Sequence, residues 1–235
     1  MKDPTSGTNV SMVQEFVWDG LEEIGTQMSP RVSATKAPTT RNRDASVIAA
    51  AIEVMSEKGY AATSIQEVAD RVGVLKGSLY HYFDSKEELL ARILSESHAT
   101  MDELQAEIHA QGLRPYDELM EYIRRQTIWY LENRDRANIY FTERRHLTGE
   151  RRERARENGR KFESYILDLV VAAQKDGDIR QDQSPQLITR FLTGALNGVR
   201  FWQSRSAQQF SIDEIAEASV ALVHSAISAH SAVSA

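Results

Sequence analysis

The sequence predicts an all-α protein. From Arg41 onward, apolar residues recur at the three- and four-residue spacing of one helix face, almost without a break. The chain of 235 residues contains only 12 glycines and 5 prolines, widely scattered, which argues against a fold of many strands and turns. The sequence also shows no alternating strand pattern and no internal repeat. We therefore expect helices joined by short loops throughout the folded part of the chain.

Composition divides the chain into three parts. Residues 1–40 are rich in Ser, Thr, Pro and Gly and predict a flexible leader. Within this leader, residues 12–24 carry apolar side chains at helical spacing, which predicts either a weakly docked short helix or a regulatory arm. We expect the two folded domains to occupy residues 41–90 and 91–235.

Capping signals and glycines set the order of the helices. The first helix is expected over Asp44–Lys58, with Gly59 as its stop. Ser64 and Glu67 have the spacing of a capping box that begins the second helix, and Gly73 ends that helix. The later helices are expected over Leu75–Phe83, Ser85–Ile108, Pro115–Asn133, Arg136–Leu147, Gly149–Lys175, Pro185–Arg205 and Ser211–His230.

Composition also excludes several classes of protein. The absence of cysteine rules out disulfides, thiolate metal sites and a thiol nucleophile. No apolar run approaches the ~18 residues of a membrane span, and no signal-peptide pattern is present, so we expect a cytoplasmic protein without membrane contact. The net charge is −6 and no segment is a basic arm, so nucleic-acid binding would depend on a few well-placed side chains.

The third predicted helix has two distinct faces. Leu75, Leu79 and Phe83 recur every four residues, so we expect them to pack against the preceding helices. A short helix, a tight turn and this helix make a helix-turn-helix arrangement, whose exposed residues reach base edges in the DNA major groove. The exposed residues are Lys76, Gly77, Tyr80 and His81, flanked by Ser78 and Tyr82. The pattern predicts binding to duplex DNA.

Four residues suit contact with the DNA backbone. Tyr80, Tyr82 and Lys86 carry the hydroxyl and ammonium groups that bind phosphate oxygens. Ser64 stands at a helix N-terminus, where backbone N–H groups attract phosphate. The alternative is a purely structural three-helix bundle, in which the exposed Tyr-His-Tyr cluster would have no role.

Residues 63–89, TSIQEVADRVGVLKGSLYHYFDSKEEL, resemble the DNA-binding domain of the TetR family of bacterial transcriptional regulators. The resemblance implies a homodimer that represses at a near-palindromic operator and leaves it when a small molecule binds. It also implies that Leu75–Phe83 reads bases and that Thr63, with Tyr80, Tyr82 and Lys86, contacts the DNA backbone. The family often has a small hydroxyl residue where Leu75 stands, so that contact departs from the family pattern.

A second resemblance concerns the effector. The segment from Asn133 to Arg160, with Phe141-Thr-Glu-Arg-Arg-His-Leu147 at its centre, is similar to the branch of the family that governs fatty-acid and steroid catabolism and senses acyl-CoA thioesters. The arginine cluster that follows matches the geometry of phosphate oxygens, and we expect Arg151, Arg152 and Arg156 to bind an anionic ligand. The alternative is a solvated helix whose charges pair at i,i+3 and i,i+4.

Aromatic residues of the later helices are candidates for a ligand cavity. A mostly apolar cavity with a few polar groups suits an acyl or drug-sized ligand. Each of these side chains is also a candidate for the ordinary core. The candidate lining is Tyr122, Gln126, Trp129, Tyr140, Arg144, Phe162, Ile166, Asn197 and Trp202.

The last two helices are small-faced and are candidates for a dimer interface. Gly194 and Gly198 are four residues apart, which lets two helices approach closely, and Ile215 and Leu222 lie on the alanine-rich last helix. The alternative is tight packing within one chain.

Enzyme motifs are absent from the sequence. No histidine pair has HExxH spacing, and GxGxxG, GxxxxGK[ST] and GxSxG do not occur. We therefore expect no catalytic residues, no metal and no cofactor. The expected partners are double-stranded DNA, a small effector and a second copy of the chain. The rival class is a helical adaptor module that does not bind DNA.

Overall fold

The structure, a computed structural model, describes residues 40–202 and 210–229. Within these residues the chain is helical, with one isolated antiparallel bridge between Ile179 and Ser228, so the predicted all-α class is confirmed. The predicted leader, including its patch at residues 12–24, lies outside the described residues. No helix among the described residues is long and apolar enough to cross a membrane.

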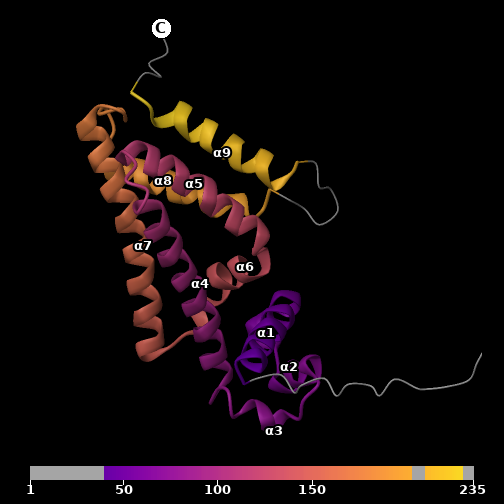
Figure 1. The fold of residues 1–235 in the computed structure, drawn as a ribbon. Helices are drawn as coiled ribbons and strands as arrows, with labels where there is room; N and C mark the ends of the chain where they lie inside the picture. The colour runs from indigo at the N-terminus through magenta and orange to yellow at the C-terminus, as the bar shows by residue number, and fades with distance from the viewer. Residues whose placement is uncertain (1–39, 203–209, 230–235) are drawn as a thin grey trace, which may run out of the picture. The chain divides into compact units, whose positions relative to one another are not determined.

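The helices follow the predicted order closely (Figure 1). They are α1 (Thr40–Ala62), α2 (Ile65–Val72), α3 (Lys76–Leu79), α4 (Lys86–His109), α5 (Pro115–Glu132), α6 (Arg134–Glu143), the 3-10 turn η1 (Arg144–His146), α7 (Gly149–Asp176), α8 (Pro185–Val199) and α9 (Ile212–Ile227). The predicted stop at Gly59 falls inside α1, where this glycine has φ 80° and breaks the regular helix before its last turn. A positive φ is accessible to glycine at little steric cost.

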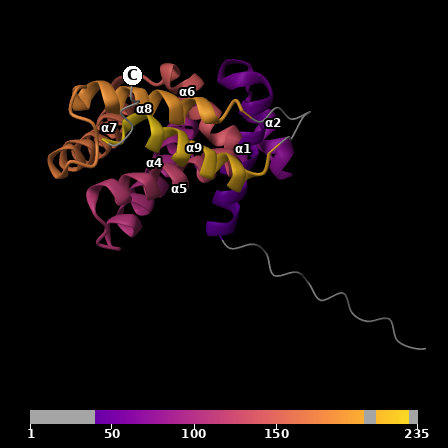
Figure 2. The ribbon, with the colours of Figure 1, turned by 90° about the horizontal axis from the view of Figure 1, so that it is seen from above.

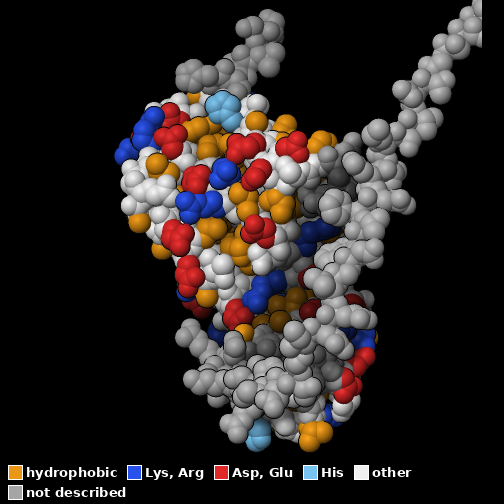
Figure 3. Space-filling view, turned by 45° about the vertical axis from the view of Figure 1, so that its right-hand side comes forward, with side chains coloured by type: hydrophobic (Ala, Val, Ile, Leu, Met, Phe, Trp, Pro, Cys, Tyr) orange, Lys and Arg blue, Asp and Glu red, His pale blue; other side chains and the backbone are white. Residues whose placement is uncertain are grey.

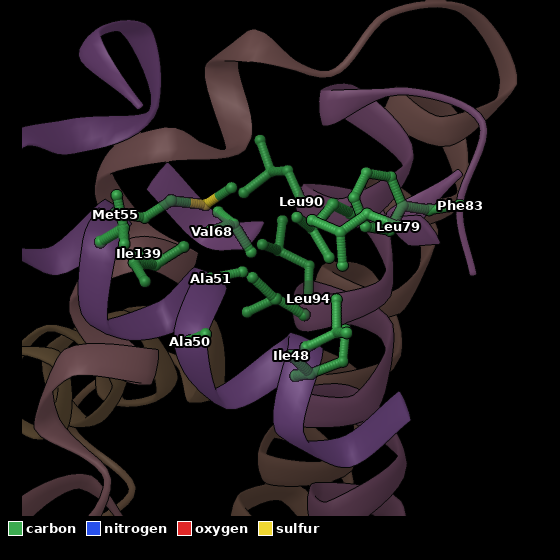
Figure 4. Packing of buried hydrophobic residues seen from close by; sticks show 14 of the residues in the cluster. Ile48, Ala50, Ala51, Met55, Val68, Leu79, Phe83, Leu90, Leu94 and Ile139 are labelled. Carbon is green, nitrogen blue, oxygen red and sulfur yellow. The ribbon is translucent and has the colours of Figure 1, made fainter. Parts of the chain in front are cut away.

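A first hydrophobic core joins α1, α2, α3 and the first half of α4 (Figure 4). Ile48 and Met55 of α1 pack with Val68, Leu79 and Leu90, and all five side chains are buried. Burying a large apolar side chain stabilises the fold by roughly 1.5–3 kcal/mol. This core fixes the short helix α3, which has too few residues to be stable by itself.

The first core also includes residues from far along the chain. Ile139 of α6 and Leu147, which follows η1, are both buried in it. Figure 4 shows Ile139 beside Met55 of α1. The region that the sequence assigns to the effector domain therefore contributes directly to the packing of the DNA-binding helices.

A second core is built around α5, which packs against α4, α7, α8 and α9. Leu119, Tyr122 and Ile123 of α5 are fully buried in it, together with Ile166 of α7 and Leu192 of α8. Figures 1 and 2 both show α9 alongside α5 and α8. Among the described residues, this arrangement leaves the outer faces of α8 and α9 exposed.

Helix α4 connects the two cores. Its 24 residues span about 36 Å at the usual rise per residue. Leu90, Ile93 and Leu94 are buried in the first core, and Ile108 is buried in the second. The helix begins at the end of the helix-turn-helix unit, as Figure 1 shows.

Candidate DNA-binding surface and effector cavity

Two local motifs set the angle between α2 and α3. The capping box is present: the Ser64 hydroxyl accepts from the Glu67 N–H at 3.3 Å, and the Glu67 carboxylate accepts from the Ser64 N–H at 3.0 Å. Glu67 also pairs with Lys58 of α1. This bond and the hydrogen bonds from the Ser64 N–H and hydroxyl together lower the pKa of Glu67 to about 2. Gly73 ends α2 with φ 77°, and its N–H donates to Ala69 at 2.9 Å. These contacts make the turn a fixed corner.

The third helix is shorter than predicted. The regular part is Lys76–Leu79, and the residues up to Tyr82 continue as turns with i to i−3 hydrogen bonds. Leu79 and Phe83 are buried, as predicted. The prediction for Leu75 is wrong: its side chain is 81% exposed. Leu75 precedes the first helical turn with extended backbone, φ −69° and ψ 141°, so it does not share the helical register of Leu79.

Around Leu75 lies the surface that the sequence assigns to DNA. Lys76, Gly77, Tyr80 and His81 are exposed, whereas Ser78 and Tyr82 are half-buried. A side chain added at Gly77 would meet no described atom within 4 Å, so this position leaves the backbone open to a close approach. We call Leu75, Lys76, Gly77, Tyr80 and His81 the recognition surface.

The residues predicted to contact the DNA backbone differ in their accessibility. Thr63 is buried, and its hydroxyl donates to the Gly59 carbonyl at 2.8 Å. The Lys86 ammonium donates to the carbonyls of Tyr60, Ala61 and Thr63 at 2.9, 3.1 and 2.9 Å, and it lies 4.5 Å from the Tyr60 ring centroid. All three ammonium hydrogens are therefore used inside the protein, where they cap the end of α1.

Between α4, α5, α6, α7 and α8 lies a cavity of about 200 Å³. Five predicted ligand residues line it, namely Trp129, Tyr140, Arg144, Phe162 and Asn197. The remaining lining residues are Ser97, His98, Met101, Tyr130, Ala137, Phe141, Gly159, Glu163 and Thr193. Five of the lining residues are Trp, Tyr or Phe and six are polar or charged, so the wall combines the apolar surface and the polar groups that a ligand site needs.

Four predicted ligand residues lie elsewhere. Tyr122 is fully buried in the second core and packs against the rings of Phe162 and Tyr165 at 6.0 and 5.1 Å. Gln126 is also fully buried and donates to the Tyr130 hydroxyl at 2.8 Å. Ile166 is an ordinary core residue, and Trp202 is half exposed and outside the cavity wall. These four side chains therefore do not line the cavity. Residue type alone does not show how each side chain packs, so the sequence could not separate them from the lining residues.

None of the ligand residues predicted from the sequence lies on α4, yet three residues of this helix contribute to the cavity. Ser97, His98 and Met101 lie on the cavity wall. The signal was present: His98 lies four residues after Leu94 and three before Met101, so a polar residue interrupts the apolar stripe of the helix. A polar residue at a buried helix position is a candidate ligand contact, because burial demands a hydrogen-bond partner.

A groove lined by arginines adjoins the cavity. Its lining is Arg144, Arg145, Arg152, Ala155, Arg156, Gly159, Arg160 and Glu163, and it holds about 590 Å³. The cavity and the groove share Arg144, Gly159 and Glu163. Arg152 and Arg160 form no ion pair with described residues, whereas Arg156 pairs with Glu153 at 2.7 Å.

The third anionic-ligand candidate is placed differently. Arg151 does not line the groove and lies 4.0 Å from Glu88 of α4. One helical step separates Arg151 from Arg152 by about 100°, enough to move a side chain from one face of the helix to another. The arginine cluster thus divides between a groove and a contact with the DNA-binding helices.

The segment Glu143–Thr148 contacts the effector cavity on one side and the DNA-binding helices on the other. Its Arg144 lines the cavity and the groove. Its His146 ring stacks on Tyr60 of α1 with 4.9 Å between centroids, and the Thr148 N–H donates to the Glu87 carboxylate at 2.7 Å. We call this segment the coupling segment, because it joins the ligand-sized cavity to the DNA-binding helices.

The outer faces of α8 and α9 carry exposed apolar side chains. Leu187 and Phe191 are exposed on α8, in one stripe with Gly194 and Gly198, and neither glycine has a described atom within 4 Å of an added Cβ. Leu222 is exposed on α9. We call these five residues the apolar stripe. On the side of the molecule that Figure 3 shows, hydrophobic side chains stand between charged ones in the upper described part.

One predicted interface residue does not belong to this stripe. Ile215 is buried inside the chain against Leu131 and Val199. Its place in the hydrophobic repeat of α9 suits a residue of the dimer interface and a residue of the chain's own core equally well. Close packing of Gly194 and Gly198 against their own chain, the alternative considered above, does not occur among the described residues.

Comparison with known families decides the class of protein. Residues 47–93 match the model described as bacterial regulatory proteins, tetR family, and residues 112–227 match that of the tetracyclin repressor-like C-terminal domain. The chain belongs to the TetR family. It is a DNA-binding transcriptional regulator, as the resemblance of residues 63–89 indicated.

Named relatives agree with this assignment. The HTH-type transcriptional repressor KstR2 of Rhodococcus jostii (strain RHA1) is 30% identical over 199 residues, which cover 83% of this chain and 94% of the relative. The structure of the ketosteroid transcriptional regulator KstR2 of Mycobacterium tuberculosis has the same fold, with a TM-score of 0.74 at 21% identity, over 84% of this chain and 99% of that one.

A further structure shares the fold of this TetR-family regulator. The crystal structure of AibR in complex with isovaleryl coenzyme A and operator DNA matches with a TM-score of 0.67 at 22% identity. The match covers 77% of this chain and 97% of that one.

Replacing Lys86 by Met should lower the free energy of unfolding by about 1–3 kcal/mol, because three carbonyl groups lose their donor. The salt dependence of DNA binding should change little. Urea unfolding and DNA titrations at several salt concentrations measure both quantities. Tyr80→Phe, which removes an exposed hydroxyl, is the control for stability. A salt slope that falls by about one while stability is unchanged would make Lys86 a phosphate ligand instead.

Leu75 is expected to contact the C5-methyl group of a thymine in the major groove, since an exposed apolar side chain there has no other base feature to match. In a DNA sequence selected by the wild-type protein, replacing that thymine by deoxyuridine should cost about 0.8 kcal/mol, the value of one buried methyl-sized group. Competition binding with each thymine replaced in turn measures the loss.

The variant Leu75→Ala should bind thymine and deoxyuridine DNA equally at that position. Its thermal stability should match the wild type, because the side chain is exposed. If Leu75→Ala keeps the full sensitivity to every methyl group, Leu75 does not read thymine.

Proposed function

We propose that this TetR-family regulator is a ligand-responsive repressor. It binds a near-palindromic operator as a homodimer, and an acyl-CoA thioester releases it from the DNA. The observation that carries the proposal is the continuity of the aromatic cavity with the arginine groove through Arg144, Gly159 and Glu163. An acyl-CoA has an apolar acyl end and a phosphate-bearing end, and it needs two adjoining sites of these two chemistries.

The groove supplies cations where the phosphates would lie. Arg152 and Arg160 have no carboxylate partner among the described residues, so binding an anion would break no ion pair there. Arg156 would exchange its bond to the exposed Glu153. Exposed ion pairs of this kind contribute little to stability, so the exchange costs little.

The relatives support the same chemistry. The crystal structure of AibR is a complex with isovaleryl coenzyme A and operator DNA, and KstR2 of Rhodococcus jostii is a transcriptional repressor. The alternative of a helical adaptor without DNA binding is set aside, because the chain belongs to a family of DNA-binding regulators.

Release from DNA requires the effector to prefer one conformation of the protein. A ligand that binds the DNA-competent and incompetent states equally shifts nothing, and turning a 99:1 preference into 1:99 takes about 5.5 kcal/mol of differential affinity. Two elements of the cavity wall could transmit such a difference. Helix α4 and the coupling segment both contact the cavity and the first core.

The apolar stripe supports the homodimer. Exposed apolar side chains that line up along a helix favour an interface, because their burial is favourable. A two-fold dimer presents two recognition surfaces related by the same axis, which suits a near-palindromic operator.

Gly198→Leu should weaken the dimer, since overpacking a close interface typically costs about 1–3 kcal/mol. Among the described residues, a Cβ atom added at this position meets no atom within 4 Å, so the folded protomer should be undisturbed. Sedimentation velocity over a range of concentrations measures the dissociation. Gln186→Leu, on α8 outside the stripe, is the control. An undisturbed Gly198→Leu dimer would place the interface elsewhere.

Neutralising Arg152, Arg156 and Arg160 together to Gln should weaken a CoA thioester roughly tenfold or more, because charge-assisted bonds to phosphate are lost. Affinity for the matching free acid should stay within about twofold, since the acid has no phosphates to bind in the groove. Arg151→Gln with Arg154→Gln is the control on the same helix outside the groove. Calorimetry measures the affinities. Equal losses of affinity for the thioester and the acid would show that the arginines of α7 form a solvated helix face and do not bind the phosphates.

A further inference from the structure

One buried polar atom on the cavity wall has no partner. His98 of α4 is 9% exposed, and its Nε2 atom is buried without a hydrogen bond to any described residue. The ring packs edge-on against Tyr140, with 5.0 Å between centroids. Burial lowers the pKa of His98, so the ring is neutral at pH 7 and carries one N–H.

Neighbouring polar groups on the wall are already engaged. The Ser97 hydroxyl donates to the Ile93 carbonyl at 2.8 Å. The Tyr130 hydroxyl accepts from Gln126 at 2.8 Å and donates to the Asn197 side-chain oxygen at 3.3 Å. These groups have their hydrogen bonds whether or not a ligand is present. Nε2 of His98 is therefore the atom on this part of the wall that still requires a partner.

The cavity is also small. An apolar cavity of about 150 Å³ holds one benzene molecule. The cavity here, at about 200 Å³, takes a group of one ring or a short branched chain. A long alkyl chain or a four-ring steroid nucleus exceeds it, and would need the surrounding helices to move apart.

We propose that the cavity selects a compact acyl group that carries a hydroxyl or carbonyl oxygen, and that the Nε2–H of His98 donates a hydrogen bond to this oxygen. The inference rests on the proposed thioester effector and specifies its acyl part. In the free protein, water can serve Nε2, because the cavity has room for several molecules at about 30 Å³ each. A plain alkyl group would displace that water and leave Nε2 without a partner, whereas an oxygenated group replaces it.

The position of His98 also gives this bond a regulatory meaning. His98 lies on α4, eight residues after Leu90 of the first core. A hydrogen bond from the effector to His98 would therefore favour a particular position of α4, the helix that begins at the end of the DNA-binding unit. The oxygenated thioester should release DNA at a lower concentration than its alkyl counterpart.

The test compares thioesters that differ by one oxygen. Calorimetry on the full-length protein gives the affinity for butyryl-CoA, 3-hydroxybutyryl-CoA, acetoacetyl-CoA and palmitoyl-CoA. We expect at least one of the two oxygenated four-carbon thioesters to bind about tenfold more tightly than butyryl-CoA, and palmitoyl-CoA to bind more weakly than all three. Equal affinity for butyryl-CoA and both oxygenated thioesters, or tightest binding of palmitoyl-CoA, would overturn the inference and leave the proposed function standing.

Two variants assign the effect to His98. His98→Leu should bind butyryl-CoA and the oxygenated thioesters alike. Thr100→Ala, on the same helix outside the cavity wall, removes an exposed hydroxyl that donates to the Glu96 carbonyl at 3.0 Å, and it should keep the wild-type preference. His98→Asn, which retains an N–H donor, should recover part of it, and this variant covers the case in which His98→Leu does not fold. A preference unchanged in His98→Asn and His98→Leu would overturn the assignment. Failure of every thioester to bind the wild type would overturn the proposed function itself.

Discussion

Helix α4 runs from the first hydrophobic core into the second, and the rest of the structure depends on this connection. The first half of α4 buries Leu89, Leu90, Ile93 and Leu94 among the DNA-binding helices, and its far end buries Ile108 against α5. Close-packed cores tolerate little displacement of a buried side chain. A shift of α4 at one core is therefore felt at the other, and the cavity wall lies on the stretch between them.

The coupling segment supplies a second connection. Tyr60 of α1 contacts both the His146 ring and the Lys86 ammonium, and Glu87 of α4 accepts from Thr148. Arg144, in the same segment, lines the proposed effector site. The cavity is thus connected to the first core by two routes that differ in kind: apolar packing along α4, and polar and aromatic contacts through the coupling segment.

Local sequence signals predicted the parts of the structure that local chemistry determines. The capping box at Ser64, the left-handed Gly73 and the buried pair Leu79 and Phe83 depend on a few neighbouring residues, and each occurs as predicted. The prediction for Leu75 failed because it applied the four-residue spacing of a helix to a residue that precedes the helix. The backbone of Leu75 has an extended conformation.

The candidate site was harder to predict, since it depends on packing between distant helices. Trp129 lines the cavity, whereas Tyr122 on the same helix is buried against α7, and residue type does not separate the two. Arg151 and Arg152 are chemically identical, and only the rotation of α7 assigns one to the groove. His98 was visible as a polar interruption in an apolar stripe, but its importance follows from a cavity that several helices build together.

The central claim is that occupation of the cavity changes the affinity for DNA through α4 and the coupling segment. The most direct measurement is the coupling between the two ligands, from fluorescence anisotropy of operator DNA with and without a saturating thioester. Our account predicts an operator affinity at least about tenfold lower with thioester, and the same factor when thioester binding is measured with and without operator, as linkage requires. A thioester that binds the cavity tightly and leaves the operator affinity unchanged would contradict it.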